Sequence, residues 1–342
     1  MKTMTCLTTC AGAALLGALA VAPVQAAEPA YKVSATQVLE GPVRWDYLSM
    51  DPERHHLFLT RGDHVDVYDV AQQKVVGKIG PTPGVHGVAA APDLGRAYTS
   101  NGGSNAVTVF DLNTFATIAT VPVGSGPDAL VYDPATHRVF VANAKGNSLS
   151  VIDGASNRVE ATIALGGAPE TAVVDGKGRL FVALEDRNAI AEIDTRSMKL
   201  IARHNVAPAC DEPAGLAIDP QAGKLYAGCH NQTMVIVDTA TGKVAGSAPI
   251  GRGNDAIAFD AQRKLAFASN GDGSLTVVDG AAPYAVRQTL PTMQRARTLA
   301  LDPQTHMIYL VSAEADPAAT PAPKQRAPLK AGTFTLITVA PQ

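Results

Sequence analysis

Tryptophan, cysteine and charged side chains are scarce in this sequence of 342 residues. It contains one Trp and four Cys, and 17% of its residues are charged, with 28 Lys and Arg against 31 Asp and Glu. A net charge of −3 gives no electrostatic reason to expect nucleic acid or an anionic membrane as the main partner. The apolar fraction of 46% is typical of a folded globular protein and excludes a largely disordered one.

Several catalytic motifs are also absent. The chain has no C-x-x-C-H for haem, no G-x-G-x-x-G opening a helix and no P-loop. The stretch "GGSNA" at residues 102–106 approaches G-x-S-x-G, but it lacks the final Gly. It also lies between two predicted strands, whereas a nucleophile elbow needs a strand-to-helix turn. These absences exclude the common haem, dinucleotide, nucleotide and serine-hydrolase sites.

Long apolar runs occur only at the start of the chain. Residues 1–26 combine Lys2, a stretch rich in Ala and Leu, and the ending Val24-Gln25-Ala26. This order predicts a cleaved signal peptide and therefore a periplasmic or secreted protein. No later segment approaches the roughly 18 apolar residues of a membrane span, so we expect none.

The cysteines that follow this segment are Cys210 and Cys229. Two thiols in an oxidising compartment favour a disulfide. The alternative is a zinc site built from both cysteines, His230 and Asp211. Because this spacing is not a standard zinc pattern, we expect the disulfide.

A unit of 40 to 44 residues recurs along the rest of the chain. In its third copy, four short apolar or alternating runs cover residues 128–133, 137–143, 148–153 and 158–165, separated by turn residues. No helical period persists between them. Seven copies of four strands predict an all-β, seven-bladed β-propeller with four-stranded blades.

The two ends of the repeat array complement each other. The seventh copy stops one strand short, and residues 31–39 form an extra strand before the first copy. If this N-terminal strand joins the last blade, the ring closes without an unpaired edge. We therefore expect one propeller domain over residues 27–342, interrupted by a flexible Pro- and Ala-rich loop at 316–331 in the last blade.

The repeats resemble a known family. The stretches "YTSNGGSNAVTVFDLNT", "FVANAKGNSLSVIDGAS" and "FASNGDGSLTVVDGA" are similar to the YVTN-type repeat of YncE-like β-propellers. The Gly-His and Trp-Asp signature of WD repeats does not recur, since the only Trp of the chain is Trp45, at the start of a first strand. The resemblance implies an exported propeller and no single reaction.

One position varies while the repeat frame stays constant. It lies near the start of each first strand, which lines the central channel of a propeller, so the seven copies form a ring at one channel mouth. The ring reads Asp46, His86, Asp128, Glu170, Ala214, Asp255 and Arg297, with Glu212 adding an acid near the alanine.

This ring allows three interpretations. Asp46, Asp128, Glu170 and Asp255 could hold a divalent cation, Ca²⁺ or Zn²⁺. Crowded carboxylates could instead raise one another's pKa and serve as a general acid or base. The third interpretation is structural, with the polar groups capping strand ends and holding channel water.

The arginine of the ring, Arg297, also has two interpretations. It could neutralise Asp46, its neighbour around the ring. Alternatively, it could hold a carboxylate or phosphate of a substrate.

From these features we expect a monomeric binding module that takes an unidentified small molecule or protein at an acidic channel mouth. The alternative is a metal-assisted lactonase- or lyase-type enzyme at the same mouth, in which Asp128 or Glu170 moves the proton.

Overall fold

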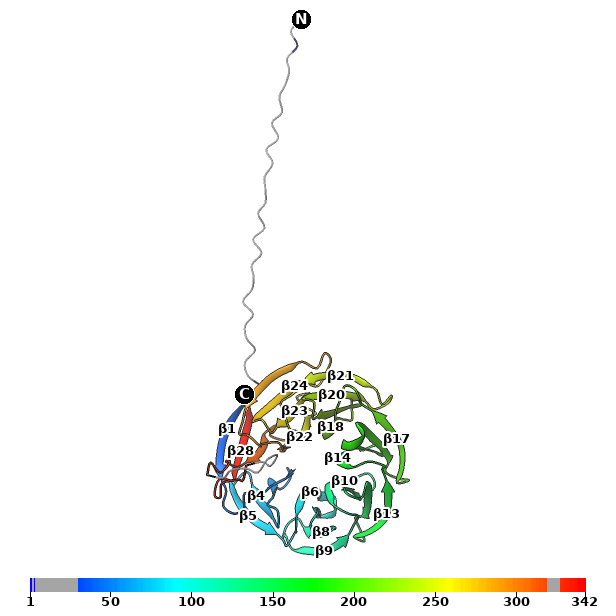
Figure 1. The fold of residues 1–342 in the computed structure, drawn as a ribbon, viewed down its shortest axis with the longest axis vertical. Helices are drawn as coiled ribbons and strands as arrows, with labels where there is room; N and C mark the ends of the chain where they lie inside the picture. Colours follow the sequence, from blue (N-terminus) through cyan, green and yellow to red (C-terminus); the bar gives the residue numbers. More distant parts are fainter. Residues whose placement is uncertain (2, 4–29, 319–326) are drawn as a thin grey trace.

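The computed structural model describes residues 1, 3, 30–318 and 327–342. The segment expected to be a signal peptide lies almost entirely outside the described residues. The described chain is all β, with seven four-stranded antiparallel sheets arranged around a central channel, as the repeat predicted (Figure 1). Two short 3₁₀ turns, η1 (Pro92–Leu94) and η2 (Glu185–Arg187), join strands.

Six blades are built from consecutive strands, running from the channel outward. The first three are β2 (Leu48–Asp51), β3 (His56–Thr60), β4 (Val65–Asp69), β5 (Lys74–Ile79); β6 (Val85–Ala91), β7 (Arg96–Asn101), β8 (Ala106–Asp111), β9 (Thr117–Pro122); and β10 (Pro127–Asp133), β11 (Arg138–Asn143), β12 (Ser148–Asp153), β13 (Arg158–Ala164). The next three are β14 (Pro169–Val174), β15 (Arg179–Leu184), β16 (Ala189–Asp194), β17 (Lys199–Asn205); β18 (Pro213–Asp219), β19 (Lys224–Cys229), β20 (Thr233–Asp238), β21 (Val244–Pro249); and β22 (Asn254–Asp260), β23 (Leu265–Asn270), β24 (Ser274–Asp279), β25 (Val286–Pro291).

The seventh blade combines the two ends of the described chain. It contains β26 (Leu299–Leu301), β27 (Ile308–Ser312) and β28 (Thr335–Pro341), with β1 (Tyr31–Val38) as its outer strand. β1 pairs antiparallel with β28 from Tyr31↔Pro341 to Val38↔Thr335, so the predicted ring closure is confirmed. Figure 1 shows β1 beside β28 at the rim.

An aromatic side chain recurs in the second strand of every blade. These residues are Phe58, Tyr98, Phe140, Phe181, Tyr226, Phe267 and Tyr309, and all of them are buried. Each ring belongs to an apolar cluster shared by two adjacent blades, and the seven clusters match the seven blade interfaces. The core is therefore a ring of flat interfaces between sheets, filled by one large ring per repeat.

Two segments around blades five and seven test further expectations. Cys210 and Cys229 form the predicted disulfide, with their Cα atoms 5.4 Å apart. The expected Pro- and Ala-rich loop lies partly outside the described residues, but its ends pair through an Ala315–Leu329 bridge. No helix in the described part of the chain is long and apolar enough to cross a membrane.

Tyr31 anchors the closing strand and provides the first prediction. It is the only buried side chain of β1, its ring meets that of Phe267 edge-on at 5.0 Å, and its backbone N–H and C=O both bond the Gln288 amide of blade six at 2.9 and 2.7 Å. Tyr31→Ala should lower the free energy of unfolding by about 3–5 kcal/mol, because it leaves a cavity at the ring closure. Urea unfolding followed by circular dichroism measures this change.

Tyr31→Phe is the matched control. The Tyr31 hydroxyl is buried and has no hydrogen-bond partner among the described residues. Its removal should therefore change stability by less than about 1 kcal/mol. Equal effects of the two variants would contradict the assignment of the anchoring to the aromatic ring.

Candidate functional site

The ring residues lie where the inner strands change register. In blades two to six the varied residue is the second residue of the strand, and the pairing with the next strand is irregular there. Such bulges re-aim a side chain without breaking the sheet. In blades one and seven the inner strand begins later, so Asp46 and Arg297 each precede it by two residues.

Asp46, His86 and Asp128 form the centre of the mouth. His86 Nδ1 lies 2.6 Å from Asp46 Oδ2 and 3.5 Å from Asp128 Oδ1. Backbone bonds hold this part in place, since the Tyr47 N–H donates to the His86 carbonyl at 3.0 Å and the Thr298 hydroxyl donates to the Asp46 carbonyl at 2.8 Å. Three adjacent blades therefore fix one imidazole between two carboxylates.

Arg297 lies on the other side of Asp46. Its Nε is 3.2 Å from Asp255 Oδ2, and its Nη2 is 3.7 Å from Asp46 Oδ1. Burial lowers the pKa of this guanidinium, but the Asp255 and Asp46 carboxylates outweigh it and raise the pKa above its ordinary value. Arg297 thus carries a fixed positive charge among the acids of the mouth.

A tyrosine from blade one crosses the channel to blade four. The Tyr47 hydroxyl donates to Glu170 Oε1 at 2.7 Å. Six of the seven positions that directly follow a ring residue carry small side chains, namely Gly87, Ala129, Thr171, Gly215, Ala256 and Thr298. Gly215 is packed so closely that a Cβ there would lie 2.7 Å from the Ala256 backbone. Tyr47 is the exception, and the small residues leave room for its ring.

Below the mouth, Tyr47 borders a cavity of about 180 Å³ in the channel. Its other lining residues are mainly small or aliphatic, among them Leu48, Val88, Leu216 and Ile257. Typical pockets for drug-sized ligands are about 300–1,000 Å³. The cavity therefore has the size for an ion, a few waters or a small group.

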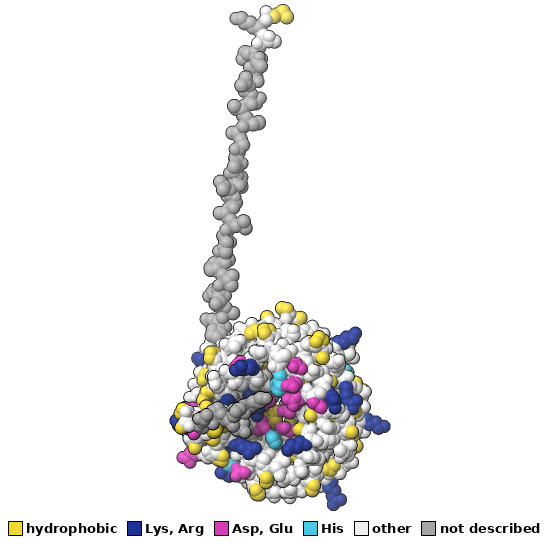
Figure 2. All heavy atoms as spheres, viewed as in Figure 1, with side chains coloured by type: hydrophobic (Ala, Val, Ile, Leu, Met, Phe, Trp, Pro, Cys, Tyr) yellow, Lys and Arg dark blue, Asp and Glu magenta, His cyan; other side chains and the backbone are white. Residues whose placement is uncertain are grey.

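Figure 2 shows acidic and histidine side chains gathered at the centre of one face, with Lys and Arg around them. Burial raises the pKa of Asp128 to about 6, the His86 charge lowers it in part, and the Asp46 carboxylate raises it further. Burial and the Asp128 charge likewise raise the pKa of Glu170 well above its ordinary value, although the Tyr47 hydrogen bond opposes them. The hydrogen bond to Asp46 raises the pKa of His86.

Burial is the largest cause of the raised pKa values of Asp128 and Glu170, and the crowding of acids adds to it. Four carboxylates, those of Asp46, Asp128, Glu170 and Asp255, converge at one narrow mouth, where His86 and Arg297 compensate part of their charge. Protonation of an acid, retention of the imidazole proton or binding of a cation each relieves the excess negative charge. The mouth is therefore able to hold a cation and to exchange protons.

Glu212 lies apart from this ring, on the rim at blade five. Its Oε2 is 2.7 Å from His230 Nδ1, and Glu185 Oε1 is 3.9 Å from the same nitrogen. The disulfide holds the two segments together, since Cys210 and Cys229 closely precede Glu212 and His230. Blade five has Ala214 at the ring position and carries its acid, Glu212, in this rim cluster instead.

Tyr47 is the residue of the mouth that the repeat did not predict. Tyr47 directly follows the ring residue Asp46. It therefore belongs to the next layer of residues along the channel. The signal in the sequence is that six of the seven corresponding positions are small and the first one is aromatic.

Seven four-stranded blades around a channel with a polar mouth define the protein as a β-propeller. The model of the YNCE-like beta-propeller family matches residues 21–179. This match confirms, over residues 21–179, the resemblance to YncE-like β-propellers that the repeats indicated. No curated protein matches the chain.

Solved structures show the same fold at low sequence identity. A chain of the hydrazine synthase of Kuenenia stuttgartiensis is 18% identical with a TM-score of 0.70, covering 82% of this chain and 94% of that one. The WD40 repeats of RRP9 are 11% identical with a TM-score of 0.77, covering 91% and 99%. A chain of the mitotic checkpoint complex is 14% identical with a TM-score of 0.73, covering 89% and 96%.

The raised pKa values predict how stability depends on pH. The pKa of Asp128 is about 6 in the folded chain against an ordinary 3.8, so the folded state binds more protons and stability falls as pH rises through that window. Asp128→Asn removes this loss. It should raise the free energy of unfolding at pH 8 by an amount on the order of 1–3 kcal/mol and have much less effect near pH 4.

Urea unfolding of both proteins from pH 4 to pH 8 measures this difference. Glu53→Gln is the matched control, because Glu53 is exposed in the β2–β3 turn at the other end of an inner strand. It should change stability by less than about 0.5 kcal/mol at every pH. A less stable Asp128→Asn variant at pH 8 would show that the carboxylate serves the fold.

The Tyr47–Glu170 hydrogen bond generates a third prediction. Tyr47→Phe removes the donor that stabilises the Glu170 carboxylate, so the pKa of Glu170 should rise further above its ordinary value. Carboxyl ¹³C NMR titration of protein labelled at Asp and Glu measures this. In the control Tyr132→Phe, the lost hydroxyl donates to Asp93 at 2.8 Å instead, and Glu170 should not respond. An unchanged Glu170 titration in Tyr47→Phe would rule out the bond across the channel.

Proposed function

We propose that this protein is an exported propeller that works as a binding module and takes a divalent cation at its channel mouth. Asp46, His86 and Asp128 support this proposal. One ligand atom from each lies within 4.8 Å of the others, and the three side chains come from three blades. Two carboxylate oxygens and an imidazole nitrogen are ligands that Zn²⁺ uses in proteins.

The observation that carries the proposal is the state of Asp128. Its Oδ1 atom is buried and accepts no hydrogen bond among the described residues, and the His86 Nδ1 atom with which it forms an ion pair is 3.5 Å away. A buried carboxylate oxygen without a donor is costly, because its lost hydration is not replaced. A cation between Asp46, His86 and Asp128 would supply the missing contact and would replace the proton that His86 holds.

Contacts at the mouth distinguish which of the four acids expected to bind metal can act as ligands. Tyr47 holds Glu170, and Arg297 pairs with Asp255, so these two acids lie outside the three-ligand group. A set that includes an imidazole favours Zn²⁺ over Ca²⁺, which prefers six to eight oxygen ligands. Glu170 and Asp255 then contribute negative charge around the ion without contacting it.

The enzyme alternative rests on the raised pKa values of Asp128 and Glu170, which suit a general acid. The channel cavity of about 180 Å³ is smaller than typical pockets for drug-sized ligands, which favours the binding module because an ion needs less room than a lactone. Export is supported by the signal-like residues 1–26 and by the Cys210–Cys229 disulfide.

Calorimetric titration with Zn²⁺ and with Ca²⁺ tests the proposed site. Zn²⁺ should bind at one site per chain and raise the melting temperature, and EDTA should reverse both effects. Binding should be tighter at pH 8 than at pH 6, because His86 must lose its proton. His86→Gln and Asp128→Asn should each weaken it at least about tenfold, since loss of even an outer-shell partner costs that much.

His230→Gln is the matched control, because the rim cluster of Glu185, Glu212 and His230 also brings three ligand atoms within 4.8 Å. It should leave binding at the mouth unchanged. Loss of binding in His230→Gln alone would place the metal on the rim, and no binding at either pH would overturn the proposal. Turnover of a lactone panel by the zinc-loaded protein, abolished by Glu170→Gln, would favour the enzyme alternative.

A further inference from the structure

A second pocket lies beside the acidic mouth and has the opposite charge. Its volume is about 250 Å³. It is lined by Val43, Arg44, Trp45, Arg295, Arg297, Ala327, Pro328 and Leu329. It therefore combines three guanidinium groups with the only tryptophan of the chain and a small apolar wall.

Two of the three guanidiniums are not neutralised. Arg297 is paired with Asp46 and Asp255, as described above. Among the residues that the structure describes, no ion pair forms to Arg44 or Arg295. Glu314 borders a neighbouring hollow with Arg295, but this carboxylate pairs with Lys330. The pocket thus retains a net positive charge next to a negative mouth.

The two arginines are held in different ways. Arg295 donates from Nη2 to the Ala327 carbonyl at 2.7 Å, which leaves its remaining N–H groups for another acceptor. Its backbone is in the left-handed region at φ 69°, and its N–H bonds the Gly271 carbonyl at 2.8 Å. Arg44 is exposed and its stem packs over Gly62, where a Cβ would lie 2.8 Å from Arg44 Cδ.

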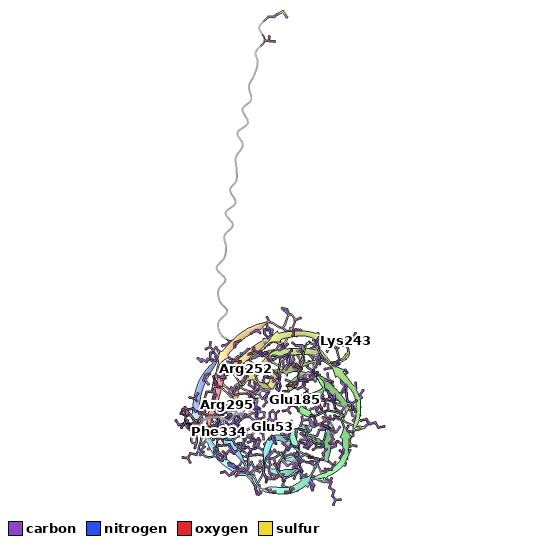
Figure 3. The ribbon with its side chains drawn as sticks, in the orientation of Figure 1. Glu53, Glu185, Lys243, Arg252, Arg295 and Phe334 are labelled. Carbon is purple, nitrogen blue, oxygen red and sulfur yellow. A yellow bond between two sulfur atoms is a disulfide. The ribbon has the colours of Figure 1, made fainter. Side chains whose placement is uncertain are left out.

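The apolar part of the pocket is also fixed. Trp45 packs on Phe334, with ring centroids 5.9 Å apart, as part of the cluster between blades one and seven. On the opposite wall, Pro328 accepts a bond from the Asp316 N–H at 2.8 Å, and Leu329 pairs with Ala315. In Figure 3, Arg295 and Phe334 lie on the β28 side of the disc, whereas Glu185 lies near its centre.

From this arrangement we infer that the pocket binds a small organic oxyanion, with its anionic group on Arg44 and Arg295 and its apolar body against Trp45. Guanidinium groups bind carboxylates and phosphates through paired N–H donors, and a buried aromatic face adds apolar contact. A cation is excluded by the arginines, and an apolar molecule without an anion leaves them unpaired. The site is separate from the proposed cation cluster and shares only Arg297 with the acidic mouth.

Trp45 makes the pocket directly observable, because tryptophan fluorescence from this chain has a single source. Benzoate, an aromatic carboxylate, is titrated against the full protein, with phenyl phosphate as the second oxyanion and benzylamine as a cation of similar shape. Inorganic phosphate carries the anionic group without an apolar body, so it measures what the anionic group contributes alone. Benzoate or phenyl phosphate should change the fluorescence saturably, and the tighter of the two identifies the preferred oxyanion.

Arg295→Gln and Arg44→Gln should each weaken this binding at least about tenfold, as expected for loss of a charge-assisted hydrogen bond. Arg44 is the second variant because its exposure makes its replacement safe for the fold. Arg252→Gln is the matched control, since Arg252 is an exposed arginine that does not line the pocket. It should leave the affinity unchanged.

Three outcomes would overturn the inference. They are a fluorescence response to benzylamine equal to that for benzoate, no saturable response to either organic oxyanion, or equal affinities in Arg252→Gln and Arg295→Gln. Zinc binding at the mouth should persist in Arg44→Gln, so failure of the oxyanion pocket and failure of the cation site are distinguishable.

Discussion

The pairing of β1 with β28 is the constraint on which the rest of the structure depends. Every blade packs on two neighbours, so a ring of seven sheets has no free interface only when the last blade is completed. β1 supplies the missing outer strand, and Tyr31 holds it to blade six through its ring and through Gln288. Closure also sets the distance between opposite inner strands, which decides what can meet in the channel.

Because this distance is fixed, the carboxylates of the mouth are held close to one another. Inner strands of a closed ring cannot move apart, so the repulsion among the four acids persists and adds to burial in raising the pKa values of Asp128 and Glu170. His86 and Arg297 relieve part of it, and Tyr47 does so for Glu170. Residues that destabilise a fold in this way commonly mark functional sites, because no structural benefit retains them.

The two proposed binding sites have opposite charge and lie beside each other. Arg297 separates them, with Asp46 and Asp255 on one side and the pocket of Arg44, Trp45 and Arg295 on the other. The charges of the two sites also act on each other, because the Arg44 charge opposes the rise in the pKa of His86. A propeller is suited to this arrangement, since each blade contributes independent loops to the same face.

Much of this molecule follows from the repeat alone. A period of about 42 residues with four alternating runs predicts four-stranded blades, because alternation and turn residues are local properties of the chain. The incomplete seventh copy and the extra strand at residues 31–39 predict the closure. The equivalent position in each copy predicts the ring of Asp46, His86 and Asp128, since symmetry places equivalent residues at equal depth in the channel.

Only the tertiary structure decided which of these residues touch. Tyr47 reaches Glu170 across the channel, Glu212 turns to His230 on the rim, and Trp45 and Arg295 line one pocket. These contacts depend on the diameter of the closed ring and on irregular loops from blades far apart in the sequence. The repeat determines where a side chain lies within its blade, whereas distances between blades arise only when all seven interfaces pack at once.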